Sequence, residues 1–254
     1  MIPYASSGEY LMTIDDISDY LESKFSSFKT LSSLSTENLL PFYRQCVLEQ
    51  ISFHFDPFNT NKYSPFQLFS SPKFTQFFFI DENNTFKNPY SFTYFRHYYT
   101  EFINHISSEG MLSKRTFKHW GSYSFVDPFI DRFFECSTTF NECIDFAGFI
   151  RFVVFLDHPK HVNTSRYFFE LFDVNGDGML DMCDVDYFVK GLVRESKVFV
   201  PVDEVFREIL DKACANDVFV TRDQFIECGC AYEIASILFD YKEFGLYYGK
   251  KDDD

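Results

Sequence analysis

The residues 173–184, DVNGDGMLDMCD, carry the side chains whose types and spacing most clearly suit a chemical task. Oxygen-bearing side chains stand at the first, third, fifth, ninth and twelfth positions of this segment: Asp173, Asn175, Asp177, Asp181 and Asp184. Calcium is a hard cation that takes roughly six to eight oxygen ligands, and an alternating acidic segment supplies them over a short length of chain. The segment therefore predicts a metal site, with calcium as its first candidate.

Two further positions match the twelve-residue loop of an EF-hand. Gly178 is at the sixth position, where such a loop turns sharply, and Leu180 is at the eighth. An ordinary acidic surface turn is the alternative, because Asp, Asn and Gly are common turn residues. The simultaneous match of several positions favours the metal loop. The departure from the usual pattern is Asp184, since the twelfth residue is normally a Glu that binds through both oxygens.

The flanking residues have the spacing of helices that position this loop. Before it, Phe168, Phe169 and Phe172 share one face of a helix expected over 163–172. The polar side chains expected to cap the start of that helix are Asn163, Thr164 and Ser165. After the loop, apolar residues recur at core-facing helical spacing: Val185, Phe188, Val189, Leu192 and Val193. Helix, acidic loop and helix make a complete EF-hand unit.

Four other segments have an apolar residue where the eighth position of an EF-hand loop would fall. They are 56–67 with Tyr63, 105–116 with Leu112, 137–148 with Ile144, and 213–224 with Val220. Gly8 and Leu11 leave a vaguer trace near the N-terminus. In 56–67 the turn position is Asn61, and Asn tolerates the left-handed conformation that Gly usually supplies. The chain therefore reads as a series of degenerate EF-hand repeats.

These other loops lack the oxygen donors that a divalent cation needs. The loop 56–67 has Phe58 at its third position and Gln67 at its twelfth, and the loop 105–116 has His105 and Thr116 at its ends. Their expected use is structural, because one repeat cannot bury its own apolar face and repeats therefore pair. The expected pairs are 105–116 with 137–148, and 173–184 with 213–224, the latter placing Leu180 against Val220.

The predicted fold class is all-α. It consists of EF-hand repeats with one competent loop and several degenerate ones, joined by short two-residue β contacts between paired loops. The segment 157–163 contains Pro159 and separates two helical stretches, so it is the expected boundary. This gives a degenerate EF-hand-like region over 1–158 and an EF-hand pair with the metal loop over 159–254.

Composition narrows the classes of function. The net charge of −15 repels a phosphate backbone, so nucleic-acid binding is not expected. We expect no membrane insertion, because the most apolar windows are too short to span a bilayer. The N-terminus lacks the pattern of a signal peptide, and the 7 Cys then indicate reduced thiols in a cytoplasmic protein. None of the common catalytic motifs occurs, so we expect no enzymatic activity.

The whole chain resembles the B-double-prime (B'') regulatory subunits of the type 2A protein phosphatase, with the gamma branch (TONNEAU2/FASS-like) closest in pattern. The highly specific stretch is the loop 173–184, and the others agree in order and spacing. Those others are Phe53–Asp56–Pro57 with Lys62–Tyr63, GMLSK at 110–114, FIDRFFE at 129–135, IDFAGFIRFVVFLD at 144–157, and SILFDYKEF at 236–244.

This resemblance implies a helical adaptor that binds the phosphatase scaffold and catalytic subunits and directs substrate choice or location. It implies a cytoplasmic place, around centrosomes or microtubules. On this resemblance, we expect the N-terminal portion of family members to be missing from this chain. The implied ligands are Asp173, Asn175 and Asp177 by side chain, Met179 by its backbone carbonyl, and Asp184.

The twelfth residue bears on the choice of metal. Asp184 has one methylene fewer than Glu, so its carboxylate reaches less far and tends toward binding through one oxygen. We therefore expect weaker calcium binding than in a loop that ends in Glu, with magnesium also admitted. Two uses of the metal stay open, signalling and simple bracing of the helices. The alternative function is a free-standing EF-hand calcium sensor or buffer.

Overall fold

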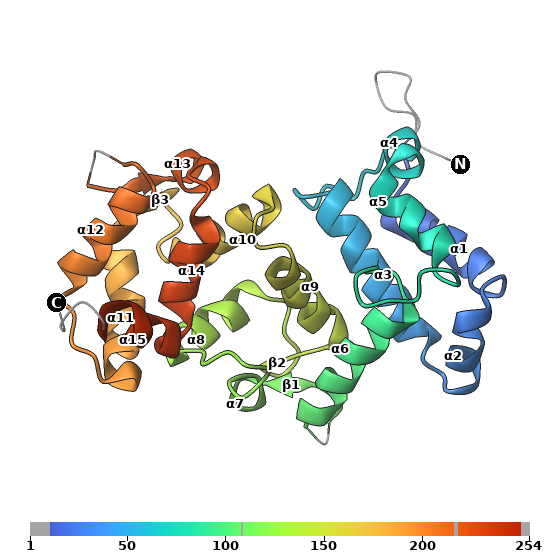
Figure 1. The fold of residues 1–254 in the computed structure, drawn as a ribbon, viewed down its shortest axis with the longest axis horizontal. Helices are drawn as coiled ribbons and strands as arrows, with labels where there is room; N and C mark the ends of the chain where they lie inside the picture. Colours follow the sequence, from blue (N-terminus) through green and yellow to red (C-terminus); the bar gives the residue numbers. More distant parts are fainter. Residues whose placement is uncertain (1–10, 108, 216–217, 250–254) are drawn as a thin grey trace. The chain divides into compact units, whose positions relative to one another are not determined.

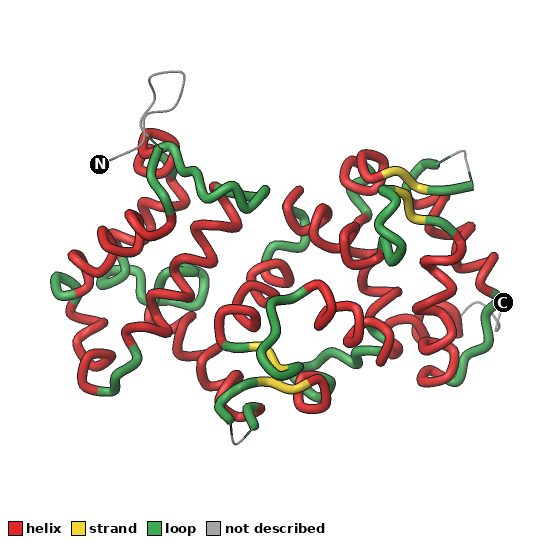
Figure 2. The backbone as a smooth tube through the Cα atoms, turned by 180° about the vertical axis from the view of Figure 1, so that it is seen from behind, coloured by secondary structure: helices red, strands yellow, loops and turns green. Residues whose placement is uncertain are grey.

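The computed structural model describes residues 11–107, 109–215 and 218–249. They form two compact units, one of Met1–Asn104 with Phe146–Val154 and the other of His105–Asp145 with Phe155–Asp254. Helices dominate both units, and the strands are only two residues long (Figures 1 and 2). The predicted all-α class is therefore confirmed. The predicted trace at Gly8 lies outside the described residues, and the boundary expected between 158 and 159 stays a prediction.

The first unit contains helices on both sides of the loop 56–67. Its α-helices are α1 (Ile14–Phe25), α2 (Ser32–Thr36), α3 (Leu40–Phe55), α4 (Pro65–Ser70), α5 (Pro72–Thr75) and α6 (Phe92–His105), with 3₁₀ turns η1 (Lys29–Leu31) and η2 (Gln76–Phe79). The helix α9 (Phe146–Asp157) begins in this unit and ends in the other. Its core is aromatic: the buried Tyr43 hydroxyl donates to the carbonyl of Tyr90 at 2.7 Å, and Phe74 stacks on Phe77.

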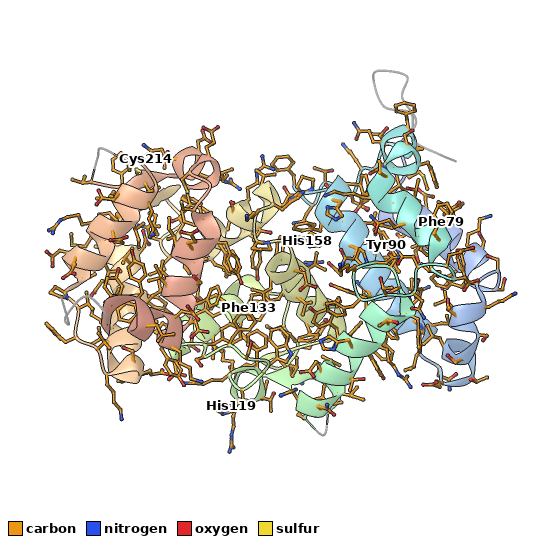
Figure 3. All side chains as sticks on the ribbon, viewed as in Figure 1. Phe79, Tyr90, His119, Phe133, His158 and Cys214 are labelled. Carbon is orange, nitrogen blue, oxygen red and sulfur yellow. The ribbon has the colours of Figure 1, made fainter. Side chains whose placement is uncertain are left out.

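The second unit carries the predicted metal loop. Its α-helices are α7 (Lys114–Phe117), α8 (Asp127–Cys136), α10 (Val162–Phe172), α11 (Met182–Ser196), α12 (Val202–Lys212), α13 (Arg222–Glu227), α14 (Ala231–Phe239) and α15 (Tyr241–Gly249). Its strands are β1 (Leu112–Ser113), β2 (Cys143–Ile144), β3 (Met179–Leu180) and β4 (Val220–Thr221). Phenylalanine fills its core, where the ring of Phe117 stacks on Phe125 and on Phe133, which Figure 3 labels.

The predicted loop pairing is confirmed. The strands β1 and β2 are antiparallel with Leu112 opposite Ile144, and β3 and β4 are antiparallel with Leu180 opposite Val220. All four of these side chains are fully buried. The loop 56–67 makes its own contact, because Tyr63 forms an antiparallel bridge with Met12. The N-terminal partner of Tyr63 is therefore Met12, for which the sequence pattern predicted no pairing.

The sixth position is left-handed in four of the loops. The φ angles are 54° at Asn61, 76° at Gly110, 59° at Glu142 and 83° at Gly178. The shared conformation reverses the chain at the same point in each loop, whether or not a metal ligand follows. The turn position is therefore a property of the repeat and does not depend on metal ligands.

The ninth and twelfth positions start the following helix in a shared way. The ninth side chain accepts the backbone N–H of the twelfth residue, and the twelfth side chain accepts the backbone N–H of the ninth. This reciprocal pair occurs in three of these loops, and again at the start of α1: Ser113 with Thr116, Asp181 with Asp184, Thr221 with Gln224, and Thr13 with Asp16. Asp184 therefore has the same helix-starting role as uncharged residues in loops without acidic ligands.

The helices around the metal loop largely follow the sequence pattern. Phe168, Phe169 and Phe172 are buried as expected, while Val193 is only half-buried. The predicted cap of the entering helix was wrong. The residue before α10 is His161, whose Nδ1 accepts the N–H of Asn163, and the three polar residues Asn163, Thr164 and Ser165 lie buried inside the helix. Thr164 instead donates its hydroxyl to the carbonyl of His158 at 2.7 Å.

The C-terminal segment of the second unit is fixed to the residues before α8. Asp240 is 4% exposed, and its carboxylate accepts backbone N–H groups of Ser124 at 2.9 Å, Lys242 at 2.9 Å and Glu243 at 3.2 Å. Phe125 forms an antiparallel bridge with Asp240. One buried carboxylate thus starts α15 and joins it to a segment more than a hundred residues earlier in the chain.

Candidate metal centre

Asp173, the first residue of the loop, holds the backbone of the following turn. Its Oδ1 accepts the N–H of Gly176 at 2.8 Å and of Asp177 at 3.1 Å, and its Oδ2 accepts the N–H of Gly178 at 2.9 Å. The side chain is 7% exposed. Charge-assisted bonds of this kind are stronger than bonds between neutral groups. The carboxylate therefore fixes the curvature of the loop around the position that a metal ion would take.

The middle of the loop places two more oxygen donors beside one another. The Asn175 Oδ1 accepts the N–H of Asp177 at 2.8 Å, and the Asp177 Oδ1 accepts the N–H of Met179 at 2.9 Å. The Asn175 Nδ2 donates to the other Asp177 oxygen at 3.1 Å. These exposed side chains are tied to the loop's own backbone. Met179 belongs to β3, so its main chain is also fixed by the pairing with Thr221.

Asp184 closes the loop from its far end. It is 2% exposed, its Oδ1 accepts the N–H of Val174 at 2.9 Å, and its Oδ2 accepts the N–H of Asp181 at 3.0 Å. Burial raises the pKa of this carboxyl, against the lowering effect of the N–H groups of Asp181 and Val174. Its two oxygens thus join the second, ninth and twelfth positions. Asp181 itself caps α11 by accepting the N–H of Cys183 at 2.7 Å.

The donor set fits a hard cation in its chemistry. The loop brings oxygen from three carboxylates, one amide and one backbone carbonyl into twelve residues, which is the ligand type that calcium and magnesium take. In the described part of the chain, however, no three His, Cys, Asp or Glu side chains gather into a group that could hold a metal ion. Gathering carboxylates raises their mutual repulsion, and a cation is what offsets it. Binding would therefore require the side chains to converge from the positions described above.

The degenerate loop 56–67 keeps the same first-position contact without the other acids. The Oδ1 of buried Asp56 accepts the N–H of Thr60 at 2.8 Å, and its Oδ2 accepts the N–H of Asn61 at 2.7 Å. Its fifth position is Thr60 where the metal loop has Asp177. The backbone of a loop of this kind is thus held by its own hydrogen bonds. The loops 56–67 and 173–184 thus share the same turn, and they differ in the acidic side chains at the ligand positions.

One residue beside the metal loop lies in the FIDRFFE stretch at 129–135, to which the sequence assigned no role at the metal site. Arg132 of α8 donates from Nε to the carbonyl of Leu171 at 3.2 Å and from Nη2 to the carbonyl of Asp173 at 3.0 Å. It reaches the loop from 41 residues earlier in the chain. Its contribution comes from the packing of α8, so no local spacing could have indicated it.

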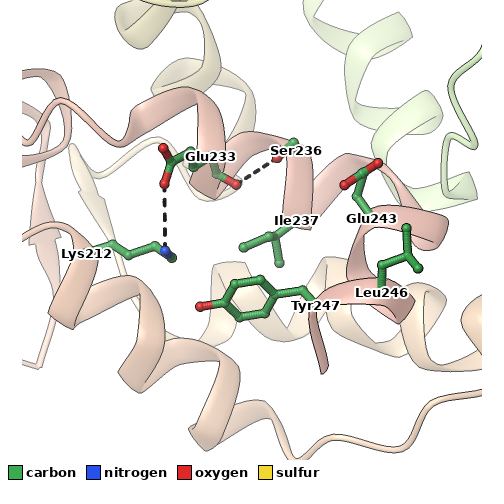
Figure 4. Close-up of a pocket in the computed structure, with 7 residues that line it drawn as sticks. All are labelled: Lys212, Glu233, Ser236, Ile237, Glu243, Leu246 and Tyr247. Carbon is green, nitrogen blue, oxygen red and sulfur yellow. Dashed lines mark hydrogen bonds and ion pairs between the residues drawn. The ribbon is translucent and has the colours of Figure 1, made fainter. Parts of the chain in front are cut away.

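A separate pocket of about 350 Å³ lies among α12, α14 and α15, and Figure 4 shows its lining. Lys212 lies 3.8 Å from Glu233 and 3.6 Å from Glu208. The Tyr247 hydroxyl donates to Glu208, and burial raises the pKa of Tyr247. These groups pair with one another at the surface. Their arrangement links α12 to α14 and α15.

The curated proteins similar to this chain are regulatory subunits of protein phosphatase 2A. No family model matches the chain. It is 22% identical over 98% of its length to the zebrafish (Danio rerio) B'' gamma regulatory subunit of serine/threonine-protein phosphatase 2A, and 21% identical to the human (Homo sapiens) protein over the same share. The Caenorhabditis elegans phosphatase 2A regulatory subunit rsa-1 is 26% identical over 46% of the chain. The matches cover 56%, 57% and 31% of these relatives, so the chain spans about half the length of the gamma subunits.

The fold has a solved counterpart. A chain described as part of a PP2A PR70 holoenzyme, in a form labelled diCa, superposes with a TM-score of 0.81. The match covers 95% of this chain and 94% of the other, at 18% sequence identity. The relatives are named as regulatory subunits of a phosphatase and not as catalytic ones, which agrees with the expectation of no enzymatic activity. Along nearly its whole length, this chain is similar to the B'' regulatory subunits of protein phosphatase 2A.

Proposed function

We propose that the chain is a regulatory part of a protein phosphatase 2A assembly, of the B'' type. In this role it is a helical adaptor that binds the phosphatase scaffold and catalytic subunits and directs substrate choice or location. The observation that carries the proposal is the similarity to B'' gamma subunits over 98% of the chain. The proposed place of action is the cytoplasm, around centrosomes or microtubules.

The architecture supports an adaptor in preference to a free-standing sensor or buffer. Helix pairs of the second unit are joined through β1–β2 and β3–β4, while only the loop 173–184 combines acidic residues at the ligand positions. A buffer or sensor usually has several competent loops. One acidic loop among degenerate ones fits repeats that hold a surface in shape.

We propose further that the loop 173–184 binds calcium. Asp173, Asn175 and Asp177 would bind by side-chain oxygen, Met179 by its carbonyl, and Asp184 by its carboxylate. Asp181 would act through a water molecule while it caps α11. The bound cation supplies the positive charge that lets the carboxylates converge. Magnesium is the proposed competitor, because Asp184 reaches less far than Glu.

Reconstitution with purified components tests the phosphatase proposal. The full chain is mixed with the purified PP2A scaffold–catalytic dimer, with calcium or with a chelator, and co-elution is followed by gel filtration. We expect a ternary complex that contains one copy of each component. Absence of any complex under both conditions contradicts the adaptor proposal, and calcium-dependent exposure of an apolar groove in the isolated chain would then favour the sensor.

Matched variants separate the metal from the assembly. Asp177→Asn removes one proposed ligand charge, and Asp186→Asn removes a carboxylate from α11 that pairs with Lys190 instead. Calcium titration should show weaker binding for Asp177→Asn and unchanged binding for Asp186→Asn. Equal affinity in both variants contradicts the assignment of Asp177 as a ligand, whatever the outcome of the reconstitution.

A further inference from the structure

The helix α8 contacts both helices that flank the metal loop. It packs against α10, which enters the loop, and against α11, which leaves it. The contact with α11 is unusually close, because a Cβ at Gly191 would meet Val126 and Pro128 at the start of α8 at 2.7–2.9 Å. Any change in the angle between α10 and α11 therefore alters the surroundings of α8.

Arg132 ties α8 to the first residue of the loop. Its guanidinium donates to the carbonyls of Leu171 at 3.2 Å and Asp173 at 3.0 Å. These carbonyls lie at the C-terminal end of α10, where the last turn of a helix leaves backbone oxygens without intrahelical donors. The partial negative charge at that end favours a cation, and the planar fork of arginine can serve two acceptors at once.

The same residue at the loop's start thus receives two kinds of restraint. The Asp173 carboxylate holds the N–H groups of Gly176, Asp177 and Gly178 inside the loop. The Asp173 carbonyl is held from outside by Arg132. A cation bound by the carboxylate of Asp173 would therefore act on a residue whose carbonyl is hydrogen-bonded to Arg132 of α8.

The far end of α8 leads into another loop pair. The helix ends at Cys136, and the following loop reaches β2, which pairs with β1. We propose that Arg132 is a positioning residue of the metal loop and carries the effect of calcium binding from 173–184 to α8 and the metal-free pair beyond it. This inference rests on the proposed binding of calcium in that loop.

Hydrogen–deuterium exchange on the full chain, with and without calcium, tests the connection. In the wild-type protein we expect calcium to slow exchange in peptides that cover the loop 173–184 and in those that cover α8. In Arg132→Gln the slowing should persist in the loop and be lost in α8. Arg207→Gln is the matched control, because it removes an exposed arginine of α12 that pairs with Asp203.

The outcomes separate the two proposals. Slowed exchange in the loop without any change in α8 of the wild-type protein overturns the connection and leaves the metal proposal standing. No calcium effect in the loop overturns both. Slowing of α8 that is as large in Arg132→Gln as in the wild-type protein shows that Arg132 is not the connecting residue and overturns the proposal.

Calcium affinity supplies a second readout that separates positioning from charge. If Arg132 positions the loop, Arg132→Gln should weaken calcium binding on the order of fivefold, at the low end of couplings between sites. Arg132→Lys keeps the charge but loses the two-acceptor fork, so it should weaken binding as well. Tighter calcium binding by Arg132→Gln, with wild-type affinity in Arg132→Lys, would show that Arg132 acts only as a repelling charge and would refute the proposal.

Discussion

The close contact between α11 and the start of α8 predicts that a larger residue at Gly191 destabilises the protein. In Gly191→Ala the added Cβ would lie 2.7 Å from Val126 Cγ2, 2.8 Å from Pro128 Cδ and 2.9 Å from Pro128 Cγ. Neither neighbour can move cheaply, because a β-branched side chain and a proline ring are stiff. Overpacking costs about 1–3 kcal/mol, and three contacts below 3 Å with stiff neighbours place this substitution in the upper part of that range, at about 2–3 kcal/mol. The better helix propensity of Ala returns about 1 kcal/mol. We expect a net loss of about 1–2 kcal/mol in the free energy of unfolding.

The chain offers its own control and its own probe. In Gly245→Ala of α15 the new Cβ would lie 3.4 Å from Ser196 Cβ and 3.9 Å from Val198 Cγ2, which leaves room for it after a small adjustment. This variant should be neutral or more stable, by up to about 1 kcal/mol. The single tryptophan, Trp120, is buried in the same unit, so its fluorescence during urea denaturation follows the unfolding of that unit.

The two variants should shift the urea midpoint of unfolding in different directions. We expect Gly191→Ala to unfold at a lower urea concentration than the wild-type protein, and Gly245→Ala at an equal or higher one. If Gly191→Ala were as stable as Gly245→Ala, the close approach of α8 and α11 would be refuted, and with it one support for the connection through α8.

Three further predictions concern carboxylates. Asp184→Glu lengthens the twelfth side chain and should tighten calcium binding measured by isothermal titration; equal affinity would reject the argument from side-chain reach. Asp240→Ala leaves the buried N–H of Ser124 without its acceptor and should cost about 2–4 kcal/mol of unfolding free energy in urea titrations; a loss well under 1 kcal/mol would contradict that role. The N–H and hydroxyl of Thr30 hold the pKa of Asp81 below its ordinary value. Because the pKa of Asp81 is depressed in the folded state, its ionised carboxylate stabilises the folded protein above pH ~4. This contribution to the free energy of unfolding is lost as the pH falls through the folded-state pKa. Asp81→Asn should flatten this acid dependence of stability, seen by circular dichroism, and an unchanged profile would exclude Asp81 as its source.

The repeat architecture could be predicted because its signals are local. The apolar eighth residue and the left-handed sixth residue lie within each loop, so the pairs Leu112–Ile144 and Leu180–Val220 followed from position alone. The partner of Tyr63, Met12, was not predicted, because the N-terminal segment has few residues that mark a loop. Local spacing thus indicates which loops pair, and fixes the register only where the loop pattern is strong.

The surroundings of the metal loop could be predicted only in part. The acidic residues could be identified in the sequence as candidate ligands. The hydrogen bond that Asp184 accepts from the N–H of Val174 could not be predicted, because it depends on how the loop closes. The cap of α10 was missed because His161 is an uncommon capping residue and the expected polar residues face the core. The contact of Arg132 with the loop was not predicted for a different reason, since it depends on the packing of α8 against α10.

We propose that the loop 173–184 binds a metal, whereas the loop 56–67 keeps the backbone hydrogen bonds of its first residue without the acidic ligands. Native mass spectrometry of the full chain in calcium tests it most directly. We expect one calcium ion per chain, and we expect it to be lost when Asp173 and Asp177 are replaced together by Asn. Two ions per chain, or one ion that remains after this replacement, would contradict it.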